Sequence, residues 1–116
     1  MPKVLKEDKK LWRFVRKTCF RYAHDFKLPL KKVKPLSSKK EFFGDCSKDG
    51  HIRIQIRYGK TRLLHYFILD TMAHELAHLR HLKHTPAWFS LHTRILLEMS
   101  WEGVFKQLRR LCRSRR

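Results

Sequence analysis

Acidic residues are scarce in this sequence. Only 10 Asp and Glu stand against 28 Lys and Arg in 116 residues, so the formal net charge is +18. A field of this sign attracts polyanions, among which nucleic acid is the most common and an anionic lipid surface is the alternative. A surface that served solubility alone would mix the two signs of charge. We therefore expect nucleic acid as a partner.

The sequence also has no long hydrophobic run. Its most apolar stretch, LLHYFILDTMA at 63–73, is shorter than the roughly 20 residues that a helix needs to cross a bilayer. The first ten residues, MPKVLKEDKK, are charged and contain no apolar signal-peptide core. We therefore expect an intracellular protein with no membrane partner, located in the cytoplasm (at the nucleoid, or in the nucleus if the source is eukaryotic).

Cysteine pairs are absent as well. The three cysteines, Cys19, Cys46 and Cys112, are odd in number, and no two of them form a CxxC pair. This arrangement excludes a zinc-finger spacing and is a poor framework for disulfides. We expect reduced thiols in a reducing compartment, with Cys19 in the core and Cys46 near a turn.

Glycine and proline are few, four of each, and they separate segments of clear periodicity. The apolar share of 42% is that of a globular protein, and the length suits a single domain over residues 1–116. Thr85 and Pro86 have the residue types of a helix N-cap and a first helical position. The pattern predicts an α+β fold with a small β-sheet and several helices. The expected elements are a helix at 4–26, an edge strand or loop at 31–36, a strand–turn–strand unit at 41–58, and helices at 63–82, 86–99 and after Gly103.

The segment at 74–84, HELAHLRHLKH, holds four histidines and one glutamate. On a helix, residues four apart project from nearly the same face, so His74 and His78 can bind one zinc ion. Glu75 is one step around the helix from His74, where it can take a proton from a water molecule without being a ligand. The alternative is a set of surface histidines on an amphipathic helix. Flanking apolar residues indicate instead a buried helix, in which an ionised glutamate is costly unless it is paired or serves a metal.

A catalytic zinc site needs a third protein ligand and an open position, and three residues compete for that role. His81 lies on the same face, but a regular helix puts it about 10 Å along the axis from His74. Glu98 would suit the HExxH enzymes that use a glutamate from a second helix. His84 falls where the helix is expected to end, so the chain can fold it back onto the metal. We favour His84 and keep Glu98 and His81 as alternatives.

These residues belong to a longer pattern. GDCSKDGHIRIQIR is followed by ILDTMAHELAHLRHLKHTPAWF, and together they resemble the SprT-like, WLM and YgjP-like group of small zinc metallopeptidases. The shared pattern, over residues 41–97, is a glycine turn, a strand, HExxH, a third histidine and then aromatic residues, here Trp88 and Phe89. The resemblance implies a minimal zincin-type domain and a protein substrate, because several SprT-like and WLM members cleave proteins bound to DNA. The residues that it assigns are the zinc ligands His74, His78 and His84 and the general base Glu75.

We therefore expect a zinc metalloprotease, with Zn²⁺ as cofactor, that hydrolyses peptide bonds in proteins at or near nucleic acid. Two other functions stay open. One is a basic nucleic-acid-binding protein with a structural metal site and no turnover, and the other is an ImmA-type peptidase that cleaves one DNA-bound regulator. We expect the protein to be a monomer.

Substrate contacts are less well defined by the sequence. Tyr66, Arg80 and His92 are candidates for stabilising an oxyanion, and their spacing favours none of them. The alternating strand at 51–58 presents an edge to which an extended peptide can add. The residues expected to contact nucleic acid lie towards both ends of the chain: Lys3, Lys6, Lys9, Lys10, Arg109, Arg110, Arg113, Arg115 and Arg116.

Overall fold

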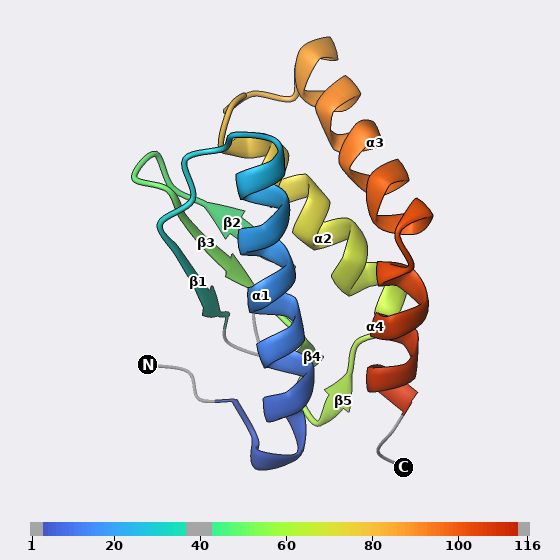
Figure 1. Cartoon of the computed structure of the whole chain (residues 1–116). Helices are drawn as coiled ribbons and strands as arrows, with labels where there is room; N and C mark the ends of the chain where they lie inside the picture. Colours follow the sequence, from blue (N-terminus) through green and yellow to red (C-terminus); the bar gives the residue numbers. More distant parts are fainter. Residues whose placement is uncertain (1–3, 37–42, 114–116) are drawn as a thin grey trace.

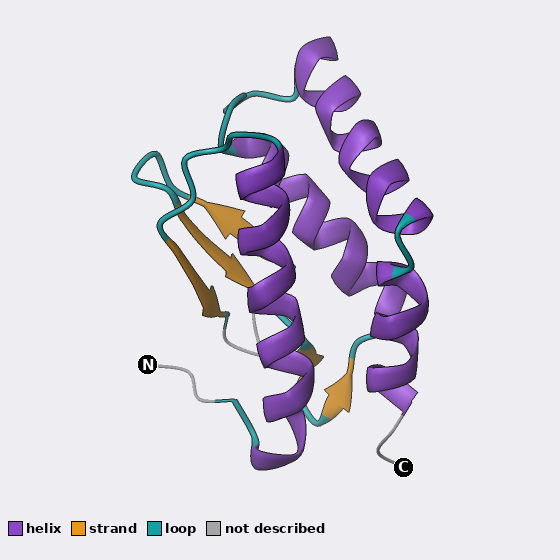
Figure 2. Cartoon of the chain, viewed as in Figure 1, coloured by secondary structure: helices purple, strands orange, loops and turns teal. Residues whose placement is uncertain are grey.

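The computed structural model, which describes residues 4–36 and 43–113, has the α+β fold that the sequence predicts. Figure 1 shows a small sheet on the left, helices α1 and α2 in the middle, and helices α3 and α4 on the right. In Figure 2 the strands of the larger sheet lie together at the left of the helices, and the two short strands of the second sheet lie lower in the view, between α1 and α4. None of the described helices is both long and apolar enough to span a bilayer. The helices are α1 (Lys9–Asp25), α2 (His65–His78), α3 (Pro86–Trp101) and α4 (Val104–Arg113).

Helix α1 follows a short 3₁₀ turn, η1 (Lys6–Asp8), and falls within the helix expected at 4–26. Its buried apolar residues recur at intervals of three and four, so one face of the helix packs into the core while Lys and Arg cover the other. Cys19 lies on the buried face and is a free thiol, as predicted. The apolar residues of this face are Leu11, Val15, Cys19, Tyr22 and Ala23.

The sheet has the strand order β1-β3-β2, where β1 is Lys32–Pro35, β2 is Gly44–Cys46 and β3 is His51–Ile54. Strand β1 pairs with β3 in parallel and is an edge strand, as predicted. Strands β2 and β3 form an antiparallel hairpin whose turn ends at Gly50, which has a φ of 85° that glycine adopts without strain. Cys46 is a free thiol at the end of β2, next to this turn. Residues 41 and 42 of the expected first strand lie outside the described residues.

The prediction of a single strand at 51–58 is wrong, because this segment forms two separate strands, β3 and β4. Strand β4 (Arg57–Tyr58) leaves the main sheet and pairs only with β5 (Thr61–Arg62). At the break, the backbone N–H of Gln55 donates to the carbonyl of Phe43 at 2.8 Å. The side chain of Gln55 at this break is fully buried. The prediction of a peptide-binding edge on this strand is also wrong, since β3 lies between β1 and β2.

Helix α2 packs against the sheet and against the other helices, which explains why apolar residues occur around most of its surface. The helix ends at His78, four residues before the predicted end at 82. Its last turn tightens, since the N–H of Leu79 donates to the carbonyl of Leu76 at 3.1 Å and Arg80 donates to Ala77 at 3.2 Å. The chain then leaves the helix axis and enters the loop to α3.

The start of α3 agrees with the prediction in detail. Pro86 is the first helical residue, and the Thr85 hydroxyl accepts a hydrogen bond from the N–H of Trp88 at 3.2 Å. The helix runs to Trp101, two residues beyond the predicted end at 99, and Gly103 with a φ of 82° separates it from α4. The Thr85 cap therefore fixes where the α2–α3 loop joins α3, and Gly103 fixes where the chain turns from α3 into α4.

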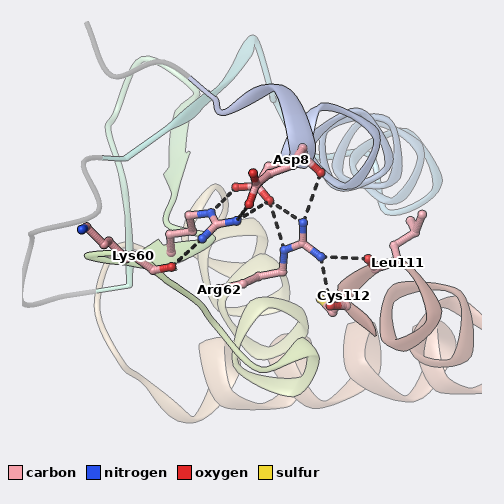
Figure 3. Close-up of polar contacts among 7 residues, drawn as sticks. Asp8, Lys60, Arg62, Leu111 and Cys112 are labelled. Atoms are coloured by element: carbon pink, nitrogen blue, oxygen red, sulfur yellow. Dashed lines mark hydrogen bonds and ion pairs between the residues drawn. The ribbon is translucent and has the colours of Figure 1, made fainter. Parts of the chain in front are cut away.

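Asp8 joins three parts of the chain that are distant in sequence (Figure 3). Its buried carboxylate accepts hydrogen bonds from Arg57 of β4 and Arg62 of β5. Arg62 also donates to the carbonyls of Leu111 at 3.1 Å and Cys112 at 2.9 Å, in the last turn of α4. A cation at that point suits the negative end of the helix dipole. The network therefore holds the β4–β5 hairpin against both α1 and α4.

Candidate metal centre

Three imidazoles converge where α2 ends and α3 begins. His74 and His78 lie one turn apart on the last two turns of α2, and the loop that follows returns His84 to them. The Nε2 atom of His78 lies 3.2 Å from that of His74 and 2.9 Å from that of His84. One ring nitrogen from each of the three residues lies within 4.8 Å of the others. The structure thus brings together the three histidines that the sequence singled out.

A backbone carbonyl orients the middle imidazole. The Nδ1 atom of His78 lies 2.9 Å from the carbonyl oxygen of His81. Because a carbonyl oxygen can only accept, Nδ1 carries the proton and Nε2 presents its lone pair towards His74 and His84. Such a contact on the far nitrogen is typical of metal-binding histidines. Sequence reasoning considered the His81 side chain and missed its carbonyl, which the early end of α2 brings into reach.

Two of the three nitrogen separations are close to those around a tetrahedral ion. Zinc bonds imidazole nitrogen at about 2.0–2.1 Å, so two ligands of a tetrahedral site lie about 3.3–3.4 Å apart. The two closest nitrogen–nitrogen separations, 3.2 and 2.9 Å, are near this value. All three donors are imidazoles, which suit zinc and other late transition metals better than calcium or magnesium.

Trp88 forms an aromatic wall behind the three imidazoles. Its ring stacks on His78 at an angle of 27° and a centroid distance of 5.1 Å, and it contacts His74 at 4.7 Å and His84 at 4.4 Å. Its indole N–H donates to the backbone carbonyl of His74 at 3.4 Å. The Thr85 cap at the start of α3 sets the position of Trp88, so the same turn that returns His84 also supports the cluster.

His92 extends this wall by one turn of α3. Its ring lies 4.9 Å from Trp88 and 5.6 Å from His74, and its Nε2 is 3.0 Å from a carboxylate oxygen of Asp70. Asp70 is on α2, one turn before His74, so the pair bridges the two helices that carry the site. The sequence offered His92 as one of three candidates for stabilising an oxyanion, but it gave no sign of Asp70, because this contact depends on how α2 and α3 cross.

Glu75 lies beside the imidazoles and points into the protein. Its side chain is nearly buried, and one carboxylate oxygen is 3.9 Å from the Nε2 of His74. Burial raises the pKa of Glu75 to about 8, and the nearby Asp45 carboxylate adds to the rise. Burial also lowers the pKa of His74 to about 4, with smaller contributions from the neighbouring histidines. Near neutral pH the site therefore holds the neutral imidazole of His74 next to a carboxyl group that can gain or lose a proton.

Strand β2 approaches Glu75 because it begins with glycine. A Cβ on Gly44 would lie 2.6 Å from Cγ2 of Thr71, 2.8 Å from the carbonyl oxygen of Arg53, and 3.2 Å from Cγ of Glu75. Any larger residue would push the strand away from α2. The close packing of β2 against α2 contributes to the burial of Glu75. The spacing of apolar residues in the sequence gives no indication that Gly44 has this role.

The other residues considered from the sequence lie apart from the cluster. Glu98 is exposed near the end of α3, where its backbone carbonyl faces the hydroxyl of Tyr22 at 3.5 Å. The guanidinium of Arg80 donates to the carbonyl of Phe26, which fastens the end of α1 to the α2–α3 loop. Tyr66 is exposed on the first turn of α2. Neither Glu98 nor the His81 side chain joins the group of converging ligand atoms among the described residues.

The family comparison agrees with this geometry. Residues 4–110 match the family described as YgjP-like, metallopeptidase domain. The chain belongs to this family. The matched segment of this YgjP-like chain includes His74, His78, His84, Glu75 and the helices α2 and α3. Membership of the family makes the chain a metallopeptidase, which acts on protein with the help of a metal. No curated protein and no solved structure matches the chain.

Proposed function

We propose that this protein is a zinc peptidase in which His74, His78 and His84 hold the ion and Glu75 is the general base. The observation that carries the proposal is the convergence of three imidazole nitrogens beside a buried carboxyl group. Zinc, when bound, lowers the pKa of a coordinated water towards 7 and polarises a carbonyl group. A site with three protein ligands leaves one position open for this chemistry.

The residues around the ion have separate tasks. Glu75 takes a proton from the attacking water and returns it to the leaving amine. The His81 carbonyl fixes the tautomer of His78, and the ring of Trp88 holds the imidazoles in their converged positions. The low pKa of His74 keeps its imidazole neutral and available as a ligand.

The free edge of β2 is the best-supported binding surface for an extended peptide. Among the described residues, β2 pairs with β3 alone and has no partner on its other side. Gly44 at the start of this strand is also next to the side chain of Glu75. A peptide that adds to β2 as a further strand would therefore pass close to the general base.

The proposed substrates are proteins held at nucleic acid. The support for this part of the proposal is the net charge of +18, which favours polyanions over neutral partners. The basic residues that we expected to contact nucleic acid are partly described: Lys3, Arg115 and Arg116 lie outside the described residues, while the remaining six occur in η1, α1 and α4.

Zinc content and proteolysis test the proposal together. The purified protein should contain one zinc ion per chain and should cleave casein or histones, with faster cleavage of histones when DNA is present. Glu75→Gln should keep the zinc and lower turnover by about 100-fold or more, which is the usual effect of removing a general base. Zinc-loaded Glu75→Gln protein that is as active as the wild type would contradict the role of Glu75.

A matched pair of variants tests the third ligand. His84→Ala should reduce zinc affinity strongly, because only two of the three converging nitrogens would remain. Glu98→Ala should leave zinc bound, because Glu98 lies apart from the cluster on α3. Zinc content measured after dialysis distinguishes the two, and the opposite result would assign the site to Glu98.

A further inference from the structure

A groove between α1 and α4 lies away from the metal centre. It has a volume of about 430 Å³ and is lined by Lys10, Arg13, Phe14 and Lys17 of α1 and by Gln107, Arg110 and Leu111 of α4. In Figure 1 this part of α1 and α4 is in the lower half of the view, whereas the α2–α3 loop that carries His84 is at the top. We call this feature the α1–α4 groove.

The α1–α4 groove is strongly positive. Four of its seven lining residues are Lys or Arg, and none is acidic. All four cations are exposed, and none of them forms an ion pair in the part of the chain that the structure describes. Elsewhere, Arg53, Arg57 and Arg62 are bound to carboxylates. The groove therefore gathers cations whose charge is available to a ligand.

The spacing of these cations matches an extended ligand. Lys10, Arg13 and Lys17 follow one another at three and four residues, so they form a row along one face of α1. The row covers about 10 Å at 1.5 Å per residue. Arg110 contributes a cation from α4 on the opposite wall. An anion with several charges along its length can contact both walls, whereas a single phosphate cannot satisfy the whole row.

The lining of the groove includes two apolar side chains, one of them aromatic. Phe14 lies between the cations of α1, and Leu111 is opposite on α4. Both side chains are half-buried, so each offers a face to the groove while its remainder packs in the protein. An aromatic face beside a row of cations is the combination that binds single-stranded nucleic acid, because bases stack on the ring while the cations follow the backbone.

We propose that the α1–α4 groove binds a single strand of DNA or RNA through its phosphates, with a base on Phe14. The assignment gives the nucleic-acid part of the proposed function a location and does not depend on the metal centre. Carboxylates of an acidic peptide would contact the cations but would leave the ring of Phe14 without a stacking partner. A membrane surface would need protruding apolar residues, while Phe14 and Leu111 lie within the groove.

Fluorescence anisotropy with the zinc-loaded full chain tests this site. The probe is a labelled oligo(dT) strand of about 20 nucleotides, titrated over a range of salt concentrations. The double variant Arg13→Glu, Lys17→Glu should bind it at least about tenfold more weakly than the wild type at low salt. The slope of log affinity against log salt should fall by about 1.4, because each of the two cations removed accounts for about 0.7 through its phosphate. Phe14→Leu should weaken binding about fivefold or more while leaving the salt slope unchanged.

The matched control is Lys32→Glu, Lys48→Glu, which makes the same change in charge at exposed positions on the sheet side. It should lower affinity much less than the groove variant. Equal reductions in affinity would show that net charge alone acts and would overturn the site. Tighter binding to anionic vesicles or to polyglutamate than to oligo(dT) would overturn the choice of ligand.

The outcomes separate this inference from the proposed function. The groove variant should keep its zinc and should cleave casein at the wild-type rate without DNA, because the groove is remote from the imidazoles. If wild-type protein binds oligo(dT) and the groove variant binds it equally well, the location fails while the nucleic-acid association stands. If the protein binds no nucleic acid at all, both the groove and the association with nucleic acid are rejected. The proposed peptidase activity is then still tested by Glu75→Gln.

Discussion

Gly44 lets strand β2 pack closely against Glu75 and Thr71 of α2. The added methyl group of Gly44→Ala would meet backbone as well as the Thr71 side chain, so the contact cannot be relieved by rotating one group. We expect the substitution to lower the free energy of unfolding by about 1–3 kcal/mol, as overpacking does. Turnover should fall as well, because the methyl group would displace Glu75. Urea denaturation and casein cleavage measure the two effects.

Gly59→Ala is the control for Gly44→Ala. A Cβ at Gly59 would meet nothing within 4 Å, but its φ of 63° is unfavourable for alanine. This variant should therefore lose about 1 kcal/mol of stability from the backbone alone and keep its activity. Equal activity in the two variants would mean that the approach of β2 does not position Glu75.

The raised pKa of Glu75 predicts a pH dependence of stability in protein from which zinc has been removed. Burial raises the pKa from an ordinary 4.5 to about 8, so between these values the folded protein keeps a proton that the unfolded chain has released. The free energy of unfolding must then fall as pH rises through this window. Glu75→Gln does not titrate, so its stability relative to the wild type should increase by on the order of 2–4 kcal/mol from pH 5 to pH 8.

Urea denaturation in the presence of a chelator, repeated at several pH values, measures this difference. The low pKa of His74 has the opposite effect on stability, but it acts in both proteins and largely cancels in the comparison. A difference between wild type and Glu75→Gln that stays constant from pH 5 to pH 8 would show that Glu75 is ionised in the folded protein across the range.

The site residues that the sequence could reveal are those related by helical spacing. The candidates His74, Glu75 and His78 follow from the geometry of one helix, and His84 was favoured over Glu98 and His81 because it lies just beyond the expected end of that helix. The His81 carbonyl, Asp70 and Gly44 could not be found in this way. Each acts through a contact that depends on the path of a loop or on the packing of separate elements, and local periodicity carries no information about either.

At the scale of elements, Asp8 determines how the β4–β5 hairpin is attached. Burial acts to raise the pKa of Asp8, but hydrogen bonds from Arg57 and Arg62 outweigh it and hold the pKa below its usual value. Asp8→Asn would leave Arg62 without its carboxylate partner and Arg57 with only the exposed Glu7, although both guanidinium groups are largely buried. We expect a loss of about 3–5 kcal/mol in the free energy of unfolding, the usual effect of breaking a buried ion pair.

Glu7→Gln is the matched control for Asp8→Asn. Glu7 also pairs with Arg57, at 2.6 Å, but its side chain is 48% exposed. Water screens such a pair, so its removal should lower the free energy of unfolding by less than about 1 kcal/mol. Urea denaturation of both variants provides the comparison. A similar small loss in both would show that the buried network contributes little to stability.

Elements defined by local signals were predicted correctly, and the element that failed is the one that the Asp8 network pulls away from the sheet. Helices α1, α3 and α4 were predictable because apolar residues at intervals of three and four, together with Thr85 and Gly103, act locally. The division of the segment 51–58 into two strands could not be predicted, because Arg57 turns away from the sheet to reach Asp8, which is 49 residues earlier in the chain. Alternation in sequence shows which residues can form a strand but not which partner the strand will have.

At the scale of the whole molecule, the positive charge opposes folding. A net charge of +18 is confined to a chain with a Cα radius of gyration of 13.3 Å, so many cations lie within each other's field. The Debye length falls from about 30 Å at 0.01 M salt to about 10 Å at 0.1 M, which is shorter than the molecule. Added sodium chloride should therefore weaken the repulsion while leaving the buried pairs of Asp8 largely unscreened.

We accordingly expect the unfolding temperature to rise with salt. Between about 0.02 and 0.3 M sodium chloride the gain should be about 4 °C, which corresponds to roughly 1 kcal/mol for a protein of this size. The variant Arg13→Glu, Lys17→Glu is the control, since each replacement changes the net charge by −2 and the two together lower it from +18 to +14. Its unfolding temperature should be higher than that of the wild type at low salt and should rise less with added salt. Differential scanning calorimetry measures both, and a fall in unfolding temperature with salt would mean that attractive pairs outweigh the repulsion.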